Sequence, residues 1–484
     1  MTEISISELL AGLDARALSS VDAVVSGIAY RSNAVLPGDA FFCIPGFEVD
    51  GHTFAADAVA RGAGALVAEH EVEGISVPQF LVSSTRAALA FASAVFFNRP
   101  SRSLKLVGIT GTNGKTTTVY LLDAIFRAAG YRTGLIGTVE TRIADERQAS
   151  SRTTPESPDL EGLLARMRDG GVSAVSMEVS SHAIDLNRVD SIEFAVVAFT
   201  NLTQDHLDYH HTLEAYFSVK RRLFTEFVAG ARVVNIDDPL GAKIAAEVDG
   251  VLTVGRAAQA DVRAEAEHST ATGTTFTLLT PEGSSVVRLP LAGSYNVSNA
   301  LVAAGCALSV GIALDGVVAG LESAPQVPGR LERIDLGQPF AVVVDYAHTP
   351  DSLAKSISAV REVTEGRVIV VFGCGGDRDP GKRPVMGASA GASADHVIIT
   401  SDNPRSEDPV GIILQVEDGL RDTTADYEVE VDRRAAIRRA LCLARPGDAV
   451  LIAGKGHEDY QIFADRTVHF DDREVAREEL QTRC

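Results

Sequence analysis

Short apolar runs alternate with helix-like stretches along most of this 484-residue chain. Such alternation is typical of βαβ units, in which helices connect the strands of a parallel sheet. Around residues 262–291 the pattern instead alternates residue by residue and becomes rich in threonine, which predicts an antiparallel flap or edge. We therefore predict an α/β fold in which most of the sheet is parallel.

Two breaks in the pattern divide the chain. The first follows Asn98-Arg99-Pro100-Ser101, and the second lies near Pro328-Gly329-Arg330, where a new series of strands and helices with Rossmann-like spacing begins. The predicted domains are an N-terminal α/β domain at 1–102, a central parallel-sheet domain at 103–329 and a C-terminal Rossmann-like domain at 330–484.

The most distinctive polar segment follows the apolar run 106–109. It reads Gly111-Thr112-Asn113-Gly114-Lys115-Thr116 and leads into a helix-compatible stretch. Glycines let backbone N–H groups face an anion, the helix N-terminus adds partial positive charge, and Lys115 can reach the terminal phosphates. The Thr116 hydroxyl is suited to Mg²⁺. Ile109 occupies the place of the first glycine of the usual motif, so the segment predicts a nucleoside-triphosphate site of variant form.

Further polar clusters follow the predicted strands of the central domain. Glu178, within Met177–His182, can hold Mg²⁺ or can be a surface residue beside a serine helix cap, and the sequence favours neither. A Ser-His nucleophile there lacks the surrounding G-x-S-x-G elbow. The segment Asn201–His211 is dense in metal and phosphate ligands, but by itself it is equally typical of a polar loop.

Lys220 falls on the apolar stripe of a predicted helix between Leu213 and Val228. Burial disfavours the charged ammonium, and the neutral amine that results could add CO₂ and form a carbamate able to face a metal ion. The alternative is a lysine whose stem packs while its ammonium reaches water. The residue pattern alone favours this second interpretation.

Three polar clusters in the C-terminal domain also follow predicted strands. They are Phe372–Asp379, which includes Arg378, Thr400–Arg405, in which Asn-Pro fixes a turn before Arg405, and Ala453–Glu458. Each by itself is more typical of a turn. Because parallel strands end at one edge of a sheet, three such clusters favour a binding cleft.

Composition narrows the classes of partner. The net charge of −21 argues against nucleic-acid and anionic-membrane partners, and it means that an anionic substrate must be met by local lysines and arginines. The five cysteines are scattered, which predicts free thiols in a reducing compartment and no zinc framework. With no signal-like or membrane-length apolar segment and no coiled coil, we expect a soluble, cytoplasmic monomer.

Taken together, these segments resemble the Mur ligases over nearly the whole chain, and most closely the members that add diaminopimelate. The matching motifs occur in the expected order: GTNGKTTT, TTPES, MEVSSHA, NLTQDHLDYH, YNVSNA, VVDYAHTPDSL, GCGGDRDPGKRP, DNPR and GKGHEDYQ. The resemblance implies a three-domain, ATP- and Mg²⁺-dependent ligase of peptidoglycan synthesis. It would join meso-diaminopimelate to UDP-N-acetylmuramoyl-L-alanyl-D-glutamate through an acyl phosphate, with UDP held by the first domain, ATP by the second and the amino acid by the third.

The resemblance also assigns roles to individual residues. The implied catalytic residues are Lys115, Lys220, Glu178 and His206, of which Lys220 would be carbamylated and would bind metal together with Thr116, Glu178 and His206. The implied nucleotide-binding residues are Gly111, Thr112, Asn113, Gly114, Lys115, Thr116, Thr117, Asn299, Asp345 and His348. The implied substrate-binding residues are Ser32, Thr153, Thr154, Ser180 and Arg188 for the UDP-muramoyl dipeptide, and Arg378, Asp402, Asn403, Pro404, Arg405, Gly454 and Glu458 for the amino acid.

The residues implied for the amino-acid pocket favour one substrate over its alternatives. Diaminopimelate has a second ammonium–carboxylate centre, to which Arg405 can donate two charge-assisted hydrogen bonds while Glu458 meets the ammonium. Lysine lacks that carboxylate and would leave the arginine without its partner, so DNPR favours meso-diaminopimelate over L-lysine or another diamine. The sequence departs from the family pattern at Arg31-Ser32-Asn33, where Asp-Ser-Arg is usual, and at Leu186, where glutamine sometimes occurs.

Overall fold

The computed structural model describes residues 3–47, 49–150 and 152–482. It confirms the predicted α/β fold with mostly parallel sheets. The chain forms two compact units, the first comprising 1–110, 131–197 and 218–232, and the second comprising 111–130, 198–217 and 233–484. This division by compactness differs from the three consecutive domains predicted from the sequence, whose boundaries stay a prediction.

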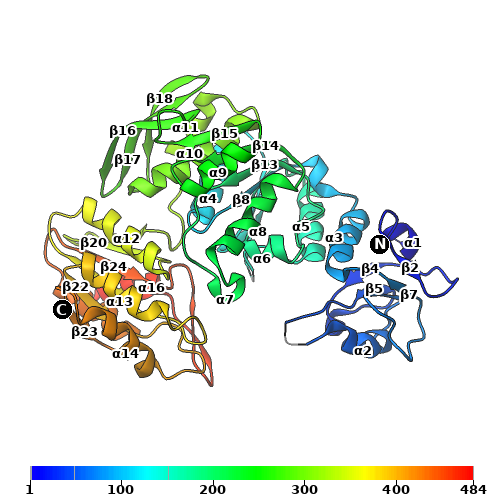
Figure 1. Cartoon of the computed structure of the whole chain (residues 1–484). Helices are drawn as coiled ribbons and strands as arrows, with labels where there is room; N and C mark the ends of the chain where they lie inside the picture. Colours follow the sequence, from blue (N-terminus) through cyan, green and yellow to red (C-terminus); the bar gives the residue numbers. More distant parts are fainter. Residues whose placement is uncertain (1–2, 48, 151, 483–484) are drawn as a thin grey trace. The chain divides into compact units, whose positions relative to one another are not determined.

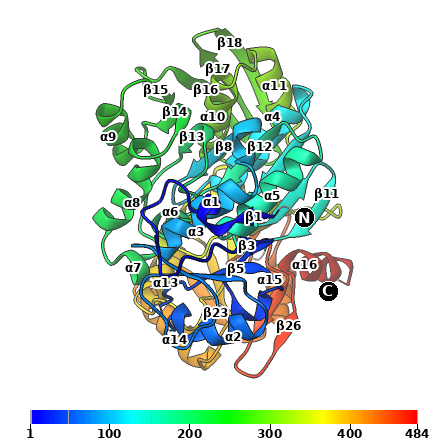
Figure 2. The same cartoon turned by 90° about the vertical axis from the view of Figure 1, so that its right-hand side faces the viewer.

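A five-stranded sheet forms the N-terminal part of the first unit, with strand order β2-β7-β6-β5-β4. Helices α1 and α3 lie on one face of this sheet and α2 on the other (Figure 2), and their apolar residues belong to two separate core clusters. All neighbouring strands are parallel except β2 and β7. The bounds are β2 Arg16–Ala17, β4 Gly27–Ala29, β5 Asp39–Phe42, β6 Ala65–Ala68, β7 Gln79–Leu81, α1 Ile6–Leu9, α2 Ala55–Ala60 and α3 Thr85–Phe96.

The largest sheet has the strand order β11-β10-β9-β12-β8-β13-β14-β15-β16-β17-β18. Its antiparallel edge β16-β17-β18 confirms the flap predicted at 262–291. The strands are β8 Lys105–Thr110, β9 Thr133–Ile136, β10 Glu140–Ile143, β11 Glu146–Ala149, β12 Ala174–Glu178, β13 Phe194–Phe199, β14 Ala229–Asn235, β15 Val251–Gly255, β16 Val262–Thr270, β17 Gly273–Thr280 and β18 Gly283–Leu289. The helices of this region are α4 Lys115–Ala128, α5 Ser157–Asp169, α6 Ser181–Asp185, α7 Leu207–His210, α8 Leu213–Thr225, α9 Pro239–Glu247, α10 Ser294–Ser309 and α11 Leu314–Glu322.

The C-terminal part of the second unit is a doubly wound sheet of order β19-β20-β24-β21-β22-β23, parallel except at β19. Helices α12, α13 and α14 cover one face, as Figure 1 shows, and α15 and α16 supply the apolar residues on the other. The bounds are β19 Glu332–Arg333, β20 Ala341–Asp345, β21 Val368–Phe372, β22 His396–Ile399, β23 Asp426–Val429, β24 Ala449–Ala453, α12 Pro350–Glu362, α13 Lys382–Ser393, α14 Pro409–Leu420, α15 Arg433–Leu443 and α16 Asp472–Gln481.

The structure bears on two expectations that came from composition, the state of the cysteines and the presence of membrane-spanning segments. Cys43, Cys306 and Cys374 are buried free thiols, as predicted, whereas Cys442 is disulfide-bonded, so the expectation of free thiols is wrong at that position. Cys484 lies outside the described residues. Within the described part of the chain, no helix is both long enough and apolar enough to cross a membrane.

Candidate nucleotide and substrate sites

The phosphate-loop segment lies between β8 and α4, as its sequence predicts. Gly111 and Gly114 have φ angles of +148° and +86°, a region that side chains rarely adopt. A Cβ added at Gly111 would overlap the Thr200 hydroxyl, and one at Gly114 would overlap the Asn299 amide oxygen. The two glycines therefore allow both the turn and the close approach of neighbouring segments.

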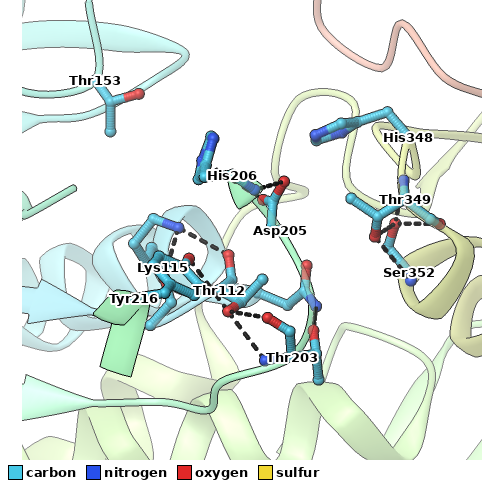
Figure 3. A network of polar contacts seen from close by, with 12 residues as sticks. Thr112, Lys115, Thr153, Thr203, Asp205, His206, Tyr216, His348, Thr349 and Ser352 are labelled. Atoms are coloured by element: carbon cyan, nitrogen blue, oxygen red, sulfur yellow. Dashed lines mark hydrogen bonds and ion pairs between the residues drawn. The ribbon is translucent and has the colours of Figure 1, made fainter. Parts of the chain in front are cut away.

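Lys115 is bonded to its own loop. Its Nζ donates to the carbonyl oxygens of Gly111 at 2.9 Å and Thr112 at 2.8 Å, and Figure 3 shows Lys115 beside Thr112. An ammonium at the start of α4 adds its charge to the positive end of the helix, which favours anion binding. The loop carbonyls accept these two hydrogen bonds, and the lysine side chain has the length to turn toward a phosphate.

The loop is also held by the segment that follows β13. Thr112 N donates to the Asn201 carbonyl at 2.8 Å, and Asn113 N donates to the Asn201 side-chain oxygen at 3.0 Å. Thr203 N donates to the Thr112 hydroxyl at 3.1 Å. The Asn113 amide group donates to Asp351 at 3.1 Å. The motif NLTQDHLDYH therefore fixes the nucleotide loop, an arrangement that separates it from an ordinary polar loop.

Asp205 and His206 continue that motif. His206 has φ +53° and an exposed ring, and its backbone N–H donates to the Asp205 carboxylate at 2.9 Å. Burial by itself would raise the pKa of Asp205, but the positive charges of His206, His348 and Lys115 outweigh it and hold that pKa below its usual range. Figure 3 shows the Asp205 carboxylate beside His206. Asp205 is thus an ionised acceptor near the phosphate loop.

The predicted nucleotide-lining residues Asn299, Asp345 and His348 occupy defined positions. Asn299 is buried beside Gly114. Asp345 accepts from Leu331 N at 2.7 Å and from the Ser356 hydroxyl at 2.8 Å, and burial raises its pKa. His348 Nδ1 donates to the Tyr346 carbonyl at 2.8 Å, which leaves Nε2 as an acceptor, and burial lowers its pKa. Thr116 and Thr117 are buried in the first turn of α4.

In the first unit, Glu178 ends β12 and is 1% exposed. Its carboxylate accepts from Thr138 N at 2.7 Å and from the Thr138 hydroxyl at 3.1 Å, and Thr138 also contacts the Thr153 hydroxyl at 3.0 Å. A Cβ at Gly137 would lie 2.6 Å from Glu178 Oε1. Glu178 is therefore a fixed, buried carboxylate, and the reading as a surface residue is wrong, whereas the expected serine helix cap is present, because Ser180 caps α6.

The predicted dipeptide-binding residues form one cluster in the first unit. The Thr154 hydroxyl donates to the Glu178 carbonyl at 2.9 Å and accepts from Ser180 N at 3.1 Å. Arg188 donates to the Thr154 carbonyl at 3.2 Å and pairs with Glu156 at 2.9 Å, and burial lowers its pKa against that attraction. Ser32 is half-buried in an otherwise exposed 3₁₀ turn at Ser32–Ala34, with Asp57 as its hydrogen-bond partner.

Lys220 is 1% exposed on α8, and its Nζ donates to the Thr110 hydroxyl at 3.3 Å, at the end of β8. The prediction that this residue lies on the buried face is confirmed. The alternative in which its ammonium reaches water is wrong, because the amine itself is buried. Helix α8 ends at Thr225, before the Val228 at which the predicted stripe ended.

The amino-acid pocket predicted in the C-terminal part is assembled from two strand ends. Asn403, in the loop after β22, donates from its side chain to Glu458 at 2.9 Å. Gly454, after β24, has φ +114°, and a Cβ there would lie 2.7 Å from the Asp402 carboxylate. Burial, followed by repulsion from Asp402, raises the pKa of Glu458.

Arg405 follows the buried Pro404 and has φ +51°. Its backbone N–H donates to the Ile462 carbonyl at 3.0 Å, and its guanidinium donates to the Gly376 carbonyl at 2.7 Å. Arg378 is exposed, and both arginines lie within 4 Å of a Cβ built at Gly375. The structure therefore presents two arginines on one side of the loop after β21.

Comparison with known proteins shows which family shares these motifs. Three family models match successive parts of the chain: "Mur ligase family, catalytic domain" at 24–97, "Mur ligase middle domain" at 109–307 and "Mur ligase, glutamate ligase domain" at 329–456. A UDP-N-acetylmuramoyl-L-alanyl-D-glutamate--2,6-diaminopimelate ligase of Geobacillus kaustophilus is 47% identical over 462 residues, which cover 93% of this chain and 94% of that protein. The chain belongs to the Mur ligase family.

Other Mur ligases agree with this placement. A protein of the same name from Gloeobacter violaceus is 44% identical over 100% of this chain and 99% of its own length. A solved structure of a UDP-N-acetylmuramoyl-L-alanyl-D-glutamate--2,6-diaminopimelate ligase superimposes with a TM-score of 0.70 at 31% identity and covers 99% of both chains. The fold of this Mur ligase is therefore shared along its length.

Sequence reasoning left four polar residues of this Mur ligase unassigned: Thr138, Asp205, Arg330 and Lys455. Arg330 donates to the Thr116 hydroxyl at 3.2 Å, and its guanidinium lies 4.6 Å from the Tyr346 ring centroid. Asp205, Arg330 and Lys455 lie inside or beside segments that the sequence already singles out, so their position in the sequence could have indicated a functional role. Thr138 lies in no motif, and its pairing with Glu178 depends on the packing of β9 beside β12.

Proposed function

We propose that this Mur ligase is the ATP-dependent enzyme that adds meso-2,6-diaminopimelate to UDP-N-acetylmuramoyl-L-alanyl-D-glutamate in peptidoglycan synthesis. The observation that carries the proposal is the DNPR–GKGHE pocket, in which Arg405 and Glu458 offer opposite charges. It is supported by relatives that are named as this ligase and match more than nine-tenths of this chain. We place the reaction in the cytoplasm and treat the enzyme as a monomer.

The reaction balances as two steps. The D-glutamyl γ-carboxylate attacks the γ-phosphorus of ATP, which forms an acyl phosphate and releases ADP. An amine of diaminopimelate then attacks the acyl carbon, and phosphate and one proton leave as the amide forms. Lys115 and the N-terminus of α4 stabilise negative charge on the transferred phosphoryl group. Arg330, which donates to Thr116, adds a second positive charge beside that helix end.

The residues proposed to bind Mg²⁺ fit a hard cation. Glu178 is a buried carboxylate, Thr116 offers a hydroxyl and His206 an imidazole. When bound, Mg²⁺ supplies positive charge to the phosphates. Addition of CO₂ to the Lys220 amine, with loss of one proton, would turn this buried residue into a further anionic oxygen ligand. Its 1% exposure supports that modification because burial disfavours the ammonium.

Replacement of Lys220 tests the carbamate. Lys220→Ala removes the carbamate oxygens, so ligation should fall by about two orders of magnitude or more, the scale seen when a transition-state charge contact is lost. Short carboxylic acids such as formate or acetate should restore part of the rate, since they supply the missing anion. Full activity of Lys220→Ala without additive would contradict the role. Arg221→Ala on the same helix is the control.

The positive charge of Arg405 favours diaminopimelate as the incoming amine. Arg405 is held by its backbone bond to Ile462 and can donate to the second carboxylate of diaminopimelate. L-lysine would leave that arginine without an anion, a penalty of roughly 1–3 kcal/mol, or about tenfold to a hundredfold in kcat/KM. The same reaction with L-lysine or another diamine is the alternative function.

A phosphate-release assay decides between the two amines. The full-length protein with ATP, Mg²⁺ and UDP-N-acetylmuramoyl-L-alanyl-D-glutamate should release phosphate with meso-diaminopimelate at a kcat/KM at least about tenfold above that with L-lysine. Arg405→Lys should narrow this preference, because lysine is a point charge without the planar fork. A wild-type preference for L-lysine would overturn the choice of amine.

A further inference from the structure

The amino-acid pocket contains a buried cation that the reaction scheme above does not use. Lys455 follows Gly454, and its side chain is fully buried. Its Nζ donates to the side-chain oxygen of Asn403 at 3.0 Å and to the Asp402 carboxylate at 3.4 Å, and it lies 3.6 Å from the Glu458 carboxylate. A buried lysine is costly unless it is paired, and these three acceptors pair it.

The contacts of Lys455 set the orientation of Asn403. The Asn403 side-chain oxygen accepts from Lys455 Nζ and from Ile462 N at 3.0 Å, while its amide group donates to Glu458 at 2.9 Å. Because two donors converge on the oxygen, the amide cannot reverse without placing its own N–H₂ against them. Lys455 thereby fixes the direction in which Glu458 is held.

The charges around Glu458 do not cancel. Asp402 and Glu458 are two carboxylates, and Lys455 supplies one positive charge between them. Arg433 also acts on both carboxylates, but its guanidinium is engaged by Asp472 at 2.7 Å, with both side chains fully buried. Among the described residues, the phenols Tyr346 and Tyr460 are also electrostatic neighbours of Glu458, and Arg405 is one of Tyr460. One negative charge is thus left for a ligand cation.

We propose that Lys455 is a positioning residue for the incoming amino acid: it neutralises one of the two pocket carboxylates and aligns Asn403 and Glu458, so that the other carboxylate receives the ammonium group of the substrate. This inference rests on the proposed function, since it names the same pocket. It predicts that the lysine acts on amino-acid binding and leaves nucleotide binding unaffected.

Steady-state kinetics of Lys455→Met test the proposal. Without the lysine charge, the pKa of Glu458 rises further, because Lys455 lowers it in the native protein. Loss of the lysine charge therefore shifts Glu458 toward its protonated form. The KM for meso-diaminopimelate should rise by about tenfold or more at pH 7 and should fall as the pH is raised to about 8.5. The wild-type KM should change by less than about twofold over the same range, and the KM for ATP and kcat at saturation should change far less than the amino-acid KM.

Two further variants test the same proposal if Lys455→Met folds poorly. Lys455→Gln retains a hydrogen-bond donor without charge and should show the same pH dependence, whereas Lys455→Arg retains the charge and should not. Adding Glu458→Gln to Lys455→Met should remove the pH dependence. Lys243→Met on α9, whose Nζ lies over the Phe217 ring, is the matched control and should behave as wild type.

Two results would overturn the inference. One is a pH-independent amino-acid KM in Lys455→Met and Lys455→Gln, and the other is an equal rise of KM for all three substrates. The proposed function fails separately, if the wild-type protein does not use meso-diaminopimelate. In that event the same comparison, made with the amino acid that the wild-type enzyme accepts, still tests Lys455.

Discussion

Individual buried charges in this enzyme are matched by specific partners. Arg433 and Asp472 form a fully buried pair at 2.7 Å, and removal of one partner from such a pair costs about 3–5 kcal/mol. Arg383 is 1% exposed and donates to Glu407, and this bond lowers the pKa of Glu407 to about 2. Lys455 follows the same rule, with the difference that its partners face a substrate pocket.

Glu161, on α5, is the contrasting case. It is 2% exposed, and within the described residues its Oε2 has no hydrogen-bond partner. Burial raises its pKa to about 8, against the attraction of Arg99, from an ordinary value of 4.5. Between pH 4.5 and pH 8 the folded protein holds a proton on Glu161 that the unfolded chain has lost. The contribution of this carboxyl to stability is therefore fully present below pH 4.5 and is lost as the pH rises through 8.

Glu161→Gln should therefore change the pH dependence of stability. The variant should exceed the wild type in free energy of unfolding by roughly 2–5 kcal/mol above pH 8, with little difference near pH 4.5. Urea unfolding followed by circular dichroism across this range measures the effect. Glu146→Gln, an exposed position in β11, is the control, and parallel pH profiles for Glu161→Gln and wild type would contradict the assignment.

At the scale of elements, the functional segments follow the carboxyl ends of parallel strands. The phosphate loop follows β8, Glu178 ends β12, the motif of Asp205 and His206 follows β13, and DNPR and GKGHE follow β22 and β24. Doubly wound sheets bind ligands at this edge because loops there meet helix N-termini. The backbone of the phosphate loop depends on Gly114, which precedes α4 and lies against Asn299.

Gly114→Ala tests that dependence. Gly130, at the other end of α4, has a similar φ of +83° but no atom within 4 Å of an added Cβ, so Gly130→Ala measures the backbone penalty alone, about 1–2 kcal/mol. Gly114→Ala adds the overlap with Asn299 and should lose more stability. It should also weaken ADP binding by at least about tenfold in calorimetry, while Gly130→Ala keeps wild-type affinity. Equal ADP affinity of the two variants would show that the close approach is not needed.

At the scale of the whole molecule, charge and substrate chemistry oppose each other. The chain carries a net charge of −21, yet its proposed substrates are a nucleoside triphosphate, a UDP-sugar peptide and a zwitterionic amino acid. The long-range field repels the anionic substrates, so binding depends on local cations such as Lys115, Arg330 and Arg188. The same excess of negative charge strains the folded state by self-repulsion.

Salt should therefore stabilise the protein. Raising NaCl from about 10 mM to about 150 mM shortens the screening length from about 30 Å to about 8 Å, which weakens repulsion across the surface more than contacts within buried pairs. We expect the midpoint of thermal unfolding to rise by a few degrees. Scanning calorimetry with an equal osmolality of glycerol as the control measures this, and a fall in the midpoint with salt would contradict it.

Much of this organisation was predictable because it is local. The alternation of apolar runs and helical patterns predicted the α/β class and the antiparallel edge at 262–291, whereas α8 ends at Thr225, sooner than its predicted stripe. Element ends depend on capping and packing, which short patterns describe poorly. The motifs, in contrast, combine glycine backbone freedom with polar side chains at strand ends, and both properties depend on residues that are consecutive in the sequence.

The sequence by itself thus determined the α/β class, the phosphate loop and the family to which the chain belongs. Only the tertiary structure decided that Thr138 holds Glu178, that the Lys220 amine is buried beside Thr110, that Glu161 is held in its protonated form and that Lys455 lies between Asp402 and Glu458. The physical reason is that pairing and desolvation depend on which strands and loops become neighbours. Residues 40 to 110 positions apart, such as Thr138 and Glu178 or Thr110 and Lys220, meet only after the sheet order is set.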